Sequence, residues 1–107
     1  MPKGHAEIFA GNCGFSTQVE AEMQGKVCQL SITSECKAIT RLAENLPEVN
    51  PYQEISFRRA LPQTYEKSIE YCSHAACPVP SGIIKAVEIA AGLALPTNVT
   101  IKLSKGD

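Results

Sequence analysis

The segment TQVEAEMQGKVCQLSIT, residues 17–33, contains two runs in which apolar and polar side chains alternate along the chain. An alternation with a period of two is typical of strands that bury one face. Gln24-Gly25 separates the two runs and favours a tight turn. The segment therefore predicts a β-hairpin. Its apolar faces are formed by Val19, Ala21 and Met23 in the first strand and by Cys28, Leu30 and Ile32 in the second.

The residues on either side of this hairpin predict a strand and a helix. Residues 6–10 are rich in strand formers and end at a turn, Gly11-Asn12-Cys13-Gly14. After Ser34 the period changes to that of a helix, with Thr33 or Ser34 as its N-cap and Pro47 at its end. The apolar positions that carry this helical spacing are Cys36, Ile39, Leu42, Ala43 and Leu46.

The second half of the chain predicts two further helices and a closing strand. Residues 47–63 indicate an irregular crossover, with a short strand or helical turn at 54–61. The next two segments predict helices, the first over 64–74 and the second from Cys77-Pro78-Val79-Pro80 to about Gly92. Their expected inward residues are Tyr65, Ile69 and Cys72 in the first, and Ile83, Val87, Ala90 and Ala91 in the second. Alternation at Val99, Ile101 and Leu103 predicts the last strand.

The predicted element order is β-β-β-α-loop-α-α-β. Strands and helices are segregated along the chain, which favours an α+β two-layer sandwich. We expect an antiparallel sheet of about four strands with the helices on one face. A length of 107 residues corresponds to a single domain, residues 1–107.

Composition excludes several classes of partner. The formal charge is −1 and aromatic residues make up 6% of the chain, so neither nucleic acid nor an anionic membrane is an expected partner. The N-terminus has no apolar stretch typical of a signal peptide. The most apolar window, residues 83–95, is too short to span a bilayer and carries two charges. We therefore expect a cytoplasmic protein.

The five cysteines are the most unusual feature of the composition. Their number is odd, and in a reducing compartment clustered thiols indicate metal binding or redox chemistry more often than disulfides. Cys28 lies on the apolar face of a predicted strand and is interpreted as a core residue. The other four, Cys13, Cys36, Cys72 and Cys77, lie where loops meet predicted elements.

Each of these four cysteines has a local setting that suits a sulfur ligand. Cys13 lies between turn glycines, and Cys36 lies in a first helical turn, although core packing accounts for Cys36 equally well. Cys72 and Cys77 are separated by four residues that include His74, a further candidate ligand. Four thiolates suit zinc or an iron–sulfur cluster, provided that the fold brings them together.

The stretch CPVPSGIIK, residues 77–85, resembles the CPxP motif of sulfur carriers of the sulfurtransferase type. In that family the cysteine opens a helix that a strand follows, and the resemblance implies that Cys77 could carry a persulfide. The motif lies near the C-terminus here, whereas the family carries it just after its first strand. The wider pattern, GNCGF through CSHAACPVPSG, resembles small cysteine-rich proteins from which no activity can be transferred.

Three functions remain open on the sequence. The first is binding of a metal or iron–sulfur centre through Cys13, Cys36, Cys72 and Cys77. The second is sulfur carriage with Cys77 as the reactive thiol. The third is an interaction module, for example a homodimer or the partner of another protein, whose cysteines are core residues. No nucleophile elbow or P-loop is present, so an enzyme is not the favoured interpretation.

Overall fold

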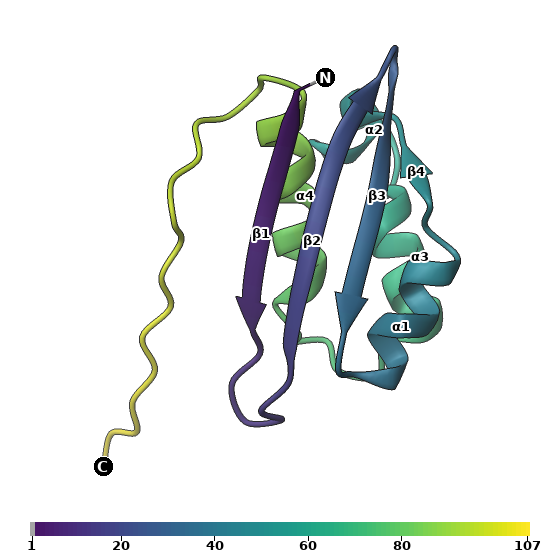
Figure 1. The fold of residues 1–107 in the computed structure, drawn as a ribbon. Coiled ribbons are helices and arrows are strands. Elements are labelled where there is room, and N and C mark those ends of the chain that lie inside the picture. Colours follow the sequence, from purple (N-terminus) through teal and green to yellow (C-terminus); the bar gives the residue numbers. More distant parts are fainter. Residues whose placement is uncertain (1) are drawn as a thin grey trace.

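One antiparallel sheet runs through the molecule in the order β1-β2-β3-β4 (Figure 1). The structure is a computed structural model, and it describes residues 2–107. The first three strands form a meander whose register places Val19 of β2 between Ala6 of β1 and Ile32 of β3. The strands are β1 Lys3–Phe9, β2 Ser16–Gln24, β3 Val27–Ser34 and β4 Glu48–Val49.

Four helices cover one face of this sheet (Figure 1). The longest, α4, packs across β1 and β2, while α1 packs against β3 and α3 lies against both α1 and α4. This arrangement confirms the predicted α+β class with an antiparallel four-stranded sheet. The helices are α1 Lys37–Glu44, α2 Pro51–Glu54, α3 Gln63–Tyr71 and α4 Val79–Ala90.

The core lies between the sheet and the helices. Its centre is formed by the apolar stripe of α4 packed against β1 and β2, and by the apolar side of α1 packed against β3. The opposite face of the sheet is polar, and Lys3 and Glu20 form an ion pair of 3.0 Å on it. The buried apolar residues are Val19, Ala21, Cys28, Ile39, Leu42, Leu46, Val49, Val79, Ile83, Ala86, Val87 and Ala90.

The fourth strand is not the predicted one. The sheet is completed by the two-residue strand β4, within the predicted crossover, so the order is β-β-β-α-β-α-α-α. The predicted strand over residues 99–103 is wrong for this structure, because these residues pair with no strand. The apolar side chains of this segment are 63% exposed at Val99, 71% at Ile101 and 89% at Leu103.

Two further expectations for the middle of the chain are also corrected. The short elements of the crossover are β4 and α2, and residues 55–62 form no helix or strand. In α3 the buried residues are Thr64 and Ser68, whereas Ile69 is 74% exposed. No helix within residues 2–107 combines the length and the apolar character needed to cross a bilayer.

Candidate functional site

Three of the predicted ligands lie at the ends of three helices. Cys36 is the N-cap of α1, Cys72 is the C-cap of α3, and Cys77 immediately precedes Pro78, the N-cap of α4. All three thiols are half-buried and pack against the core. We call Cys36, Cys72 and Cys77 the thiol cluster.

The pKa of Cys72 depends on the two other thiols of the cluster. Burial raises the pKa of the Cys72 thiol, because the charged form loses solvation. The neighbouring Cys77 and Cys36 raise that pKa further, and a hydrogen bond with Ser68 opposes the shift. A positive metal ion would reverse this effect, because it favours the thiolate form of each ligand.

The end of β3 positions Cys36. The Cys36 N–H donates to Ser34 Oγ (3.1 Å), and the hydroxyls of Ser34 and Thr17 are 2.7 Å apart. On the helical side, Thr40 Oγ1 donates to the Cys36 carbonyl oxygen (3.1 Å). Ser34 was an expected N-cap, but the capping position is occupied by Cys36, which is itself bonded to Ser34.

Residues 72–77 connect α3 to α4 and carry the other two thiols. The Cys72 N–H closes the last turn of α3 by donating to the Ser68 carbonyl (2.8 Å). The Cys77 N–H donates to the His74 carbonyl (3.2 Å), which folds the connection into a turn. Pro78 and Pro80 then restrict the backbone at the start of α4. The two cysteines are thus held on a short, constrained connection.

A cleft of about 360 Å³ opens beside this connection. It gives solvent access to the thiol cluster from one side, because both Cys72 and Cys77 contribute to its wall. His74 is exposed on the same cleft and is the nearest candidate for an additional ligand by sequence. The remaining lining residues are Tyr65, Ser68, Ile69, Ser73, Ala75, Pro80 and Ser81.

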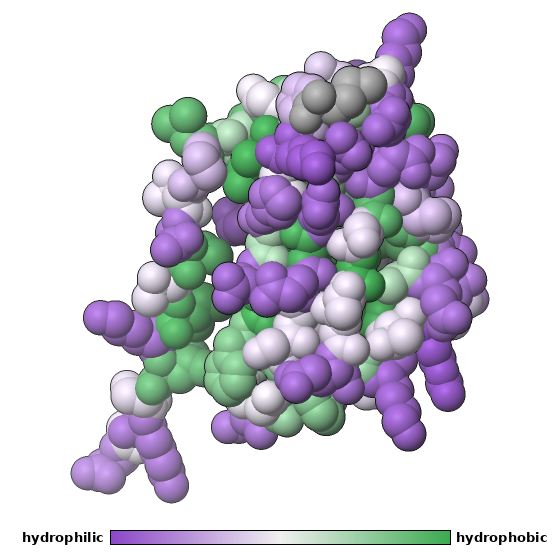
Figure 2. All heavy atoms as spheres, viewed as in Figure 1, coloured by the Kyte–Doolittle hydropathy of each residue, from purple (hydrophilic) through white to green (hydrophobic). Residues whose placement is uncertain are grey.

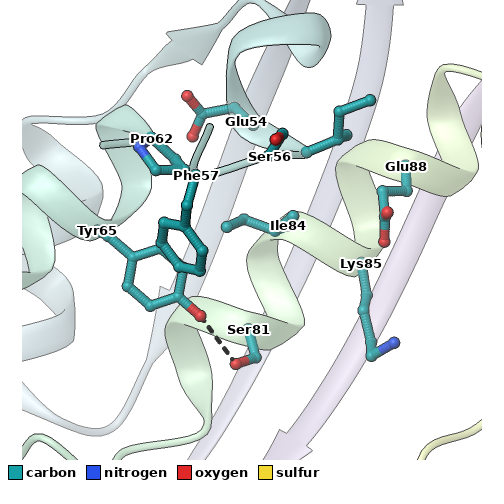
Figure 3. Close-up of a pocket in the computed structure, with 10 residues that line it drawn as sticks. Glu54, Ser56, Phe57, Pro62, Tyr65, Ser81, Ile84, Lys85 and Glu88 are labelled. Carbon is teal, nitrogen blue, oxygen red and sulfur yellow. Dashed lines mark hydrogen bonds between the residues drawn. The ribbon is translucent and has the colours of Figure 1, made fainter. Parts of the chain in front are cut away.

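A second cavity, of about 210 Å³, lies on the other side of Tyr65 and Ser81 (Figure 3). Tyr65 Oη and Ser81 Oγ are 3.1 Å apart and form part of the wall of both hollows. Phe57 packs on Tyr65 with ring centroids 5.3 Å apart, and Lys85 and Glu88 extend from α4 at the opposite side. No pattern in the sequence predicts this cavity, because residues 55–62 have no periodicity from which burial could be inferred.

The remaining cysteines lie outside the cluster. Cys13 is exposed on the turn between β1 and β2, where Gly11 and Gly14 have positive φ angles. Cys28 is completely buried beside Val49, as expected for a core residue. Within residues 2–107 no group of three or more His, Cys, Asp or Glu side chains is arranged so that it could hold a metal ion without rearrangement.

Comparison with known proteins identifies the family of the chain. Neither a curated protein nor a solved structure matches it significantly. A family model described as a family of unknown function (DUF6951) matches residues 4–103. This range includes the thiol cluster, Cys13 and most of the segment after α4. The chain therefore belongs to the DUF6951 family.

Proposed function

We propose that the protein binds a soft metal ion or an iron–sulfur centre through the thiol cluster, Cys36, Cys72 and Cys77. The observation that carries the proposal is that α3, which ends at Cys72, packs against both α1 and α4, and that Cys77 and Cys36 both raise the pKa of the half-buried Cys72 thiol. Thiolates are the preferred ligands of zinc, copper(I) and iron–sulfur clusters. We place this chemistry in the cytoplasm, where the cysteines stay reduced.

Binding requires the three side chains to rotate toward a common point. Cysteine rotates about one side-chain bond between staggered positions, and the cleft beside Cys72 and Cys77 provides room for the ion. A fourth ligand would come from solvent, from His74 or from a partner protein. Cys13 is not assigned as a ligand, because it lies outside both the cleft and the core.

Metal and acid-labile sulfide analysis of anaerobically purified protein tests the proposal. We expect Cys36→Ser, Cys72→Ser and Cys77→Ser each to lower metal occupancy at least tenfold after reconstitution with zinc or with iron and sulfide. Cys13→Ser is the matched control and should retain the occupancy of the wild type. Equal loss in the control would overturn the three-cysteine assignment, and a wild type that binds neither zinc nor a cluster would overturn the proposal.

A second candidate is sulfur carriage by Cys77, which is favoured by its position on an open cleft just before α4. The Cys77 thiolate would attack the outer sulfur of a donor persulfide, so that a new S–S bond forms while the donor's S–S bond breaks. The donor leaves as a thiolate, and Cys77 holds the persulfide. Mass spectrometry after incubation with a small-molecule persulfide would show a gain of one sulfur that is lost in Cys77→Ser and retained in Cys13→Ser.

A further inference from the structure

The segment after α4 has the pattern of a strand but no strand to pair with. Residues 98–104 alternate between apolar and polar side chains, and every residue from 92 to 107 is exposed. The exposed apolar residues of this segment include Leu95, which is 83% exposed, and Leu103, which is 89% exposed. A strand pattern with one apolar face is stable only when that face is covered and the backbone is paired.

The sheet offers a free edge of matching length. β1 is the end strand of the order β1-β2-β3-β4, so one side of its seven residues pairs with no strand in residues 2–107. The segment 98–104 also has seven residues. Figure 1 shows the C-terminal segment, in yellow, standing away from the body beyond β1, and the molecule measures 50 × 27 × 27 Å. Figure 2 shows hydrophobic residues of this segment on the side toward the body.

The direction of the chain argues against pairing within one molecule. The C-terminal segment begins at the end of the molecule where β1 begins and runs in the same direction as β1 (Figure 1). Pairing with its own β1 would therefore be parallel, whereas every other pair in this sheet is antiparallel. Parallel strands are normally covered on both faces, but the outer face of this sheet is polar and uncovered.

We propose that two copies of the chain exchange their C-terminal segments, so that residues 98–104 of each copy add as an antiparallel strand to the β1 edge of the other. A two-fold axis perpendicular to the strands reverses the strand direction of one copy relative to the other. The segment of one copy and β1 of the other are then antiparallel. Each copy then has a five-stranded sheet, and the exposed edge of β1 is covered.

The side-chain pattern agrees with one register. When residue 98 lies opposite Phe9 and residue 104 opposite Lys3, the apolar residues of the segment fall opposite the inward residues of β1. Polar side chains then meet on the outer face, and the apolar segment extends the inner layer beside α4. The inner pairs are Val99 with Ile8, Ile101 with Ala6, and Leu103 with Gly4.

Light scattering on a size-exclusion column tests the exchange with the full chain. We expect the wild type to have twice the monomer mass of 11.5 kDa. Ile101→Lys should elute as a monomer, because it buries a charge in the inner layer, whereas Thr100→Lys places the same charge on the outer face opposite Glu7 and should remain a dimer. Circular dichroism checks that both variants are folded. A monomeric wild type, or equal behaviour of the two variants, would overturn the proposal.

A cross-linking experiment separates exchange from pairing within one chain. In the proposed register Lys102 lies opposite His5, two residues from the position opposite Lys3 and on the same outer face, so a short amine-reactive linker should join these two lysines. In a mixture of unlabelled and heavy-isotope protein, exchange predicts Lys3–Lys102 peptides that contain one light and one heavy half. Links confined to peptides of a single isotope would show that the segment pairs with its own chain and would contradict the exchange.

Discussion

Within residues 2–107, Glu54 is the one charged side chain that is almost completely buried, with 2% of its surface exposed. Its carboxylate accepts hydrogen bonds from the Gln63 N–H and the Thr64 N–H, both 2.9 Å, and from the Thr64 hydroxyl at 2.6 Å. These groups lie at the start of α3, whose N-cap, Pro62, provides no side-chain bond. Glu54 thus caps α3 although it precedes the helix by nine residues. Its negative charge also interacts favourably with the positive end of the helix dipole.

Replacing this carboxylate should therefore lower the free energy of unfolding. We expect Glu54→Gln to lower the free energy of unfolding by about 1.5–3 kcal/mol. The hydrogen bonds to a charged acceptor are lost, and the side-chain NH2 group of the glutamine would face one of the backbone N–H donors. Glu66→Gln, at an exposed position in the first turn of α3, should cost only about 0.3–1 kcal/mol. Urea titration monitored by circular dichroism measures both values. Equal costs would show that Glu54 does not cap the helix.

The buried thiol of Cys28 should make stability fall at alkaline pH. Burial raises the pKa of Cys28, and a backbone hydrogen bond from Glu22 opposes the shift only in part. The folded-state pKa of Cys28 exceeds its unfolded-state value. The neutral thiol therefore makes its full contribution to the free energy of unfolding below about pH 8.5, and this contribution is lost as pH rises through the folded-state pKa. We expect the stability difference between pH 7 and pH 10 to be smaller in Cys28→Ala than in the wild type, whereas Cys13→Ala should leave it unchanged.

The contact between β1 and α4 depends on two glycines. A Cβ atom at Gly4 would collide with the Ala86 carbonyl oxygen and lie 2.9 Å from the Ala90 amide nitrogen. A Cβ atom at Gly82 would instead meet the side chain of Ile8. The backbone of a packed helix cannot move aside as the end of a side chain can, so the two positions differ in what they tolerate.

Alanine substitutions should distinguish the collision with the helix backbone at Gly4 from the contact with a side chain at Gly82. We expect Gly4→Ala to lower the free energy of unfolding by about 3 kcal/mol, since α4 must shift away from the sheet. Gly82→Ala should cost about 1 kcal/mol, because Ile8 can change its rotamer and alanine favours the helix. Thermal or urea unfolding gives the comparison, and a Gly82 variant less stable than the Gly4 variant would contradict it.

The sequence predicted the elements whose faces are set by apolar periodicity. The hairpin of β2 and β3, the start of α4 at Cys77-Pro78-Val79-Pro80 and the core role of Cys28 were predicted correctly. The inward face of α3 was predicted wrongly, because Thr64 and Ser68 are buried through hydrogen bonds to Glu54 and to the Thr64 carbonyl. Such a network joins residues ten apart and leaves no periodic signal.

In the candidate site, too, local features were predictable from the sequence and tertiary ones were not. The junction positions of Cys36, Cys72 and Cys77 were predictable from local signals of helix starts and ends. The influence of Cys36 and Cys77 on the pKa of Cys72 was not predictable, because it depends on how α1, α3 and α4 pack together, and local spacing does not encode this tertiary arrangement. The turn that carries Cys13 was also predictable, and its exposed thiol is not part of the wall of the cleft that Cys72 and Cys77 line.

The whole molecule covers one apolar surface and leaves another exposed. The α1–α4 layer covers the inner face of the sheet, yet the chain continues beyond α4 with four apolar residues, Leu95, Val99, Ile101 and Leu103, that are at least 63% exposed. Exposed apolar strands carry a risk of uncontrolled association, and folded proteins usually cover them. A closed exchange between two copies covers both segments and leaves no further free edge on β1.

If exchange stabilises the folded state, thermal stability must depend on protein concentration. Folding coupled to dimerisation raises the unfolding midpoint as concentration increases, whereas a monomer's midpoint is independent of it. We expect the midpoint of the wild type to rise by several degrees over a hundredfold range of concentration, and that of Thr100→Lys to follow it. The midpoint of Ile101→Lys should stay constant and equal the wild-type value at high dilution. A constant wild-type midpoint would mean that the folded state gains nothing from a second copy, and the exposed segment would then need a different partner.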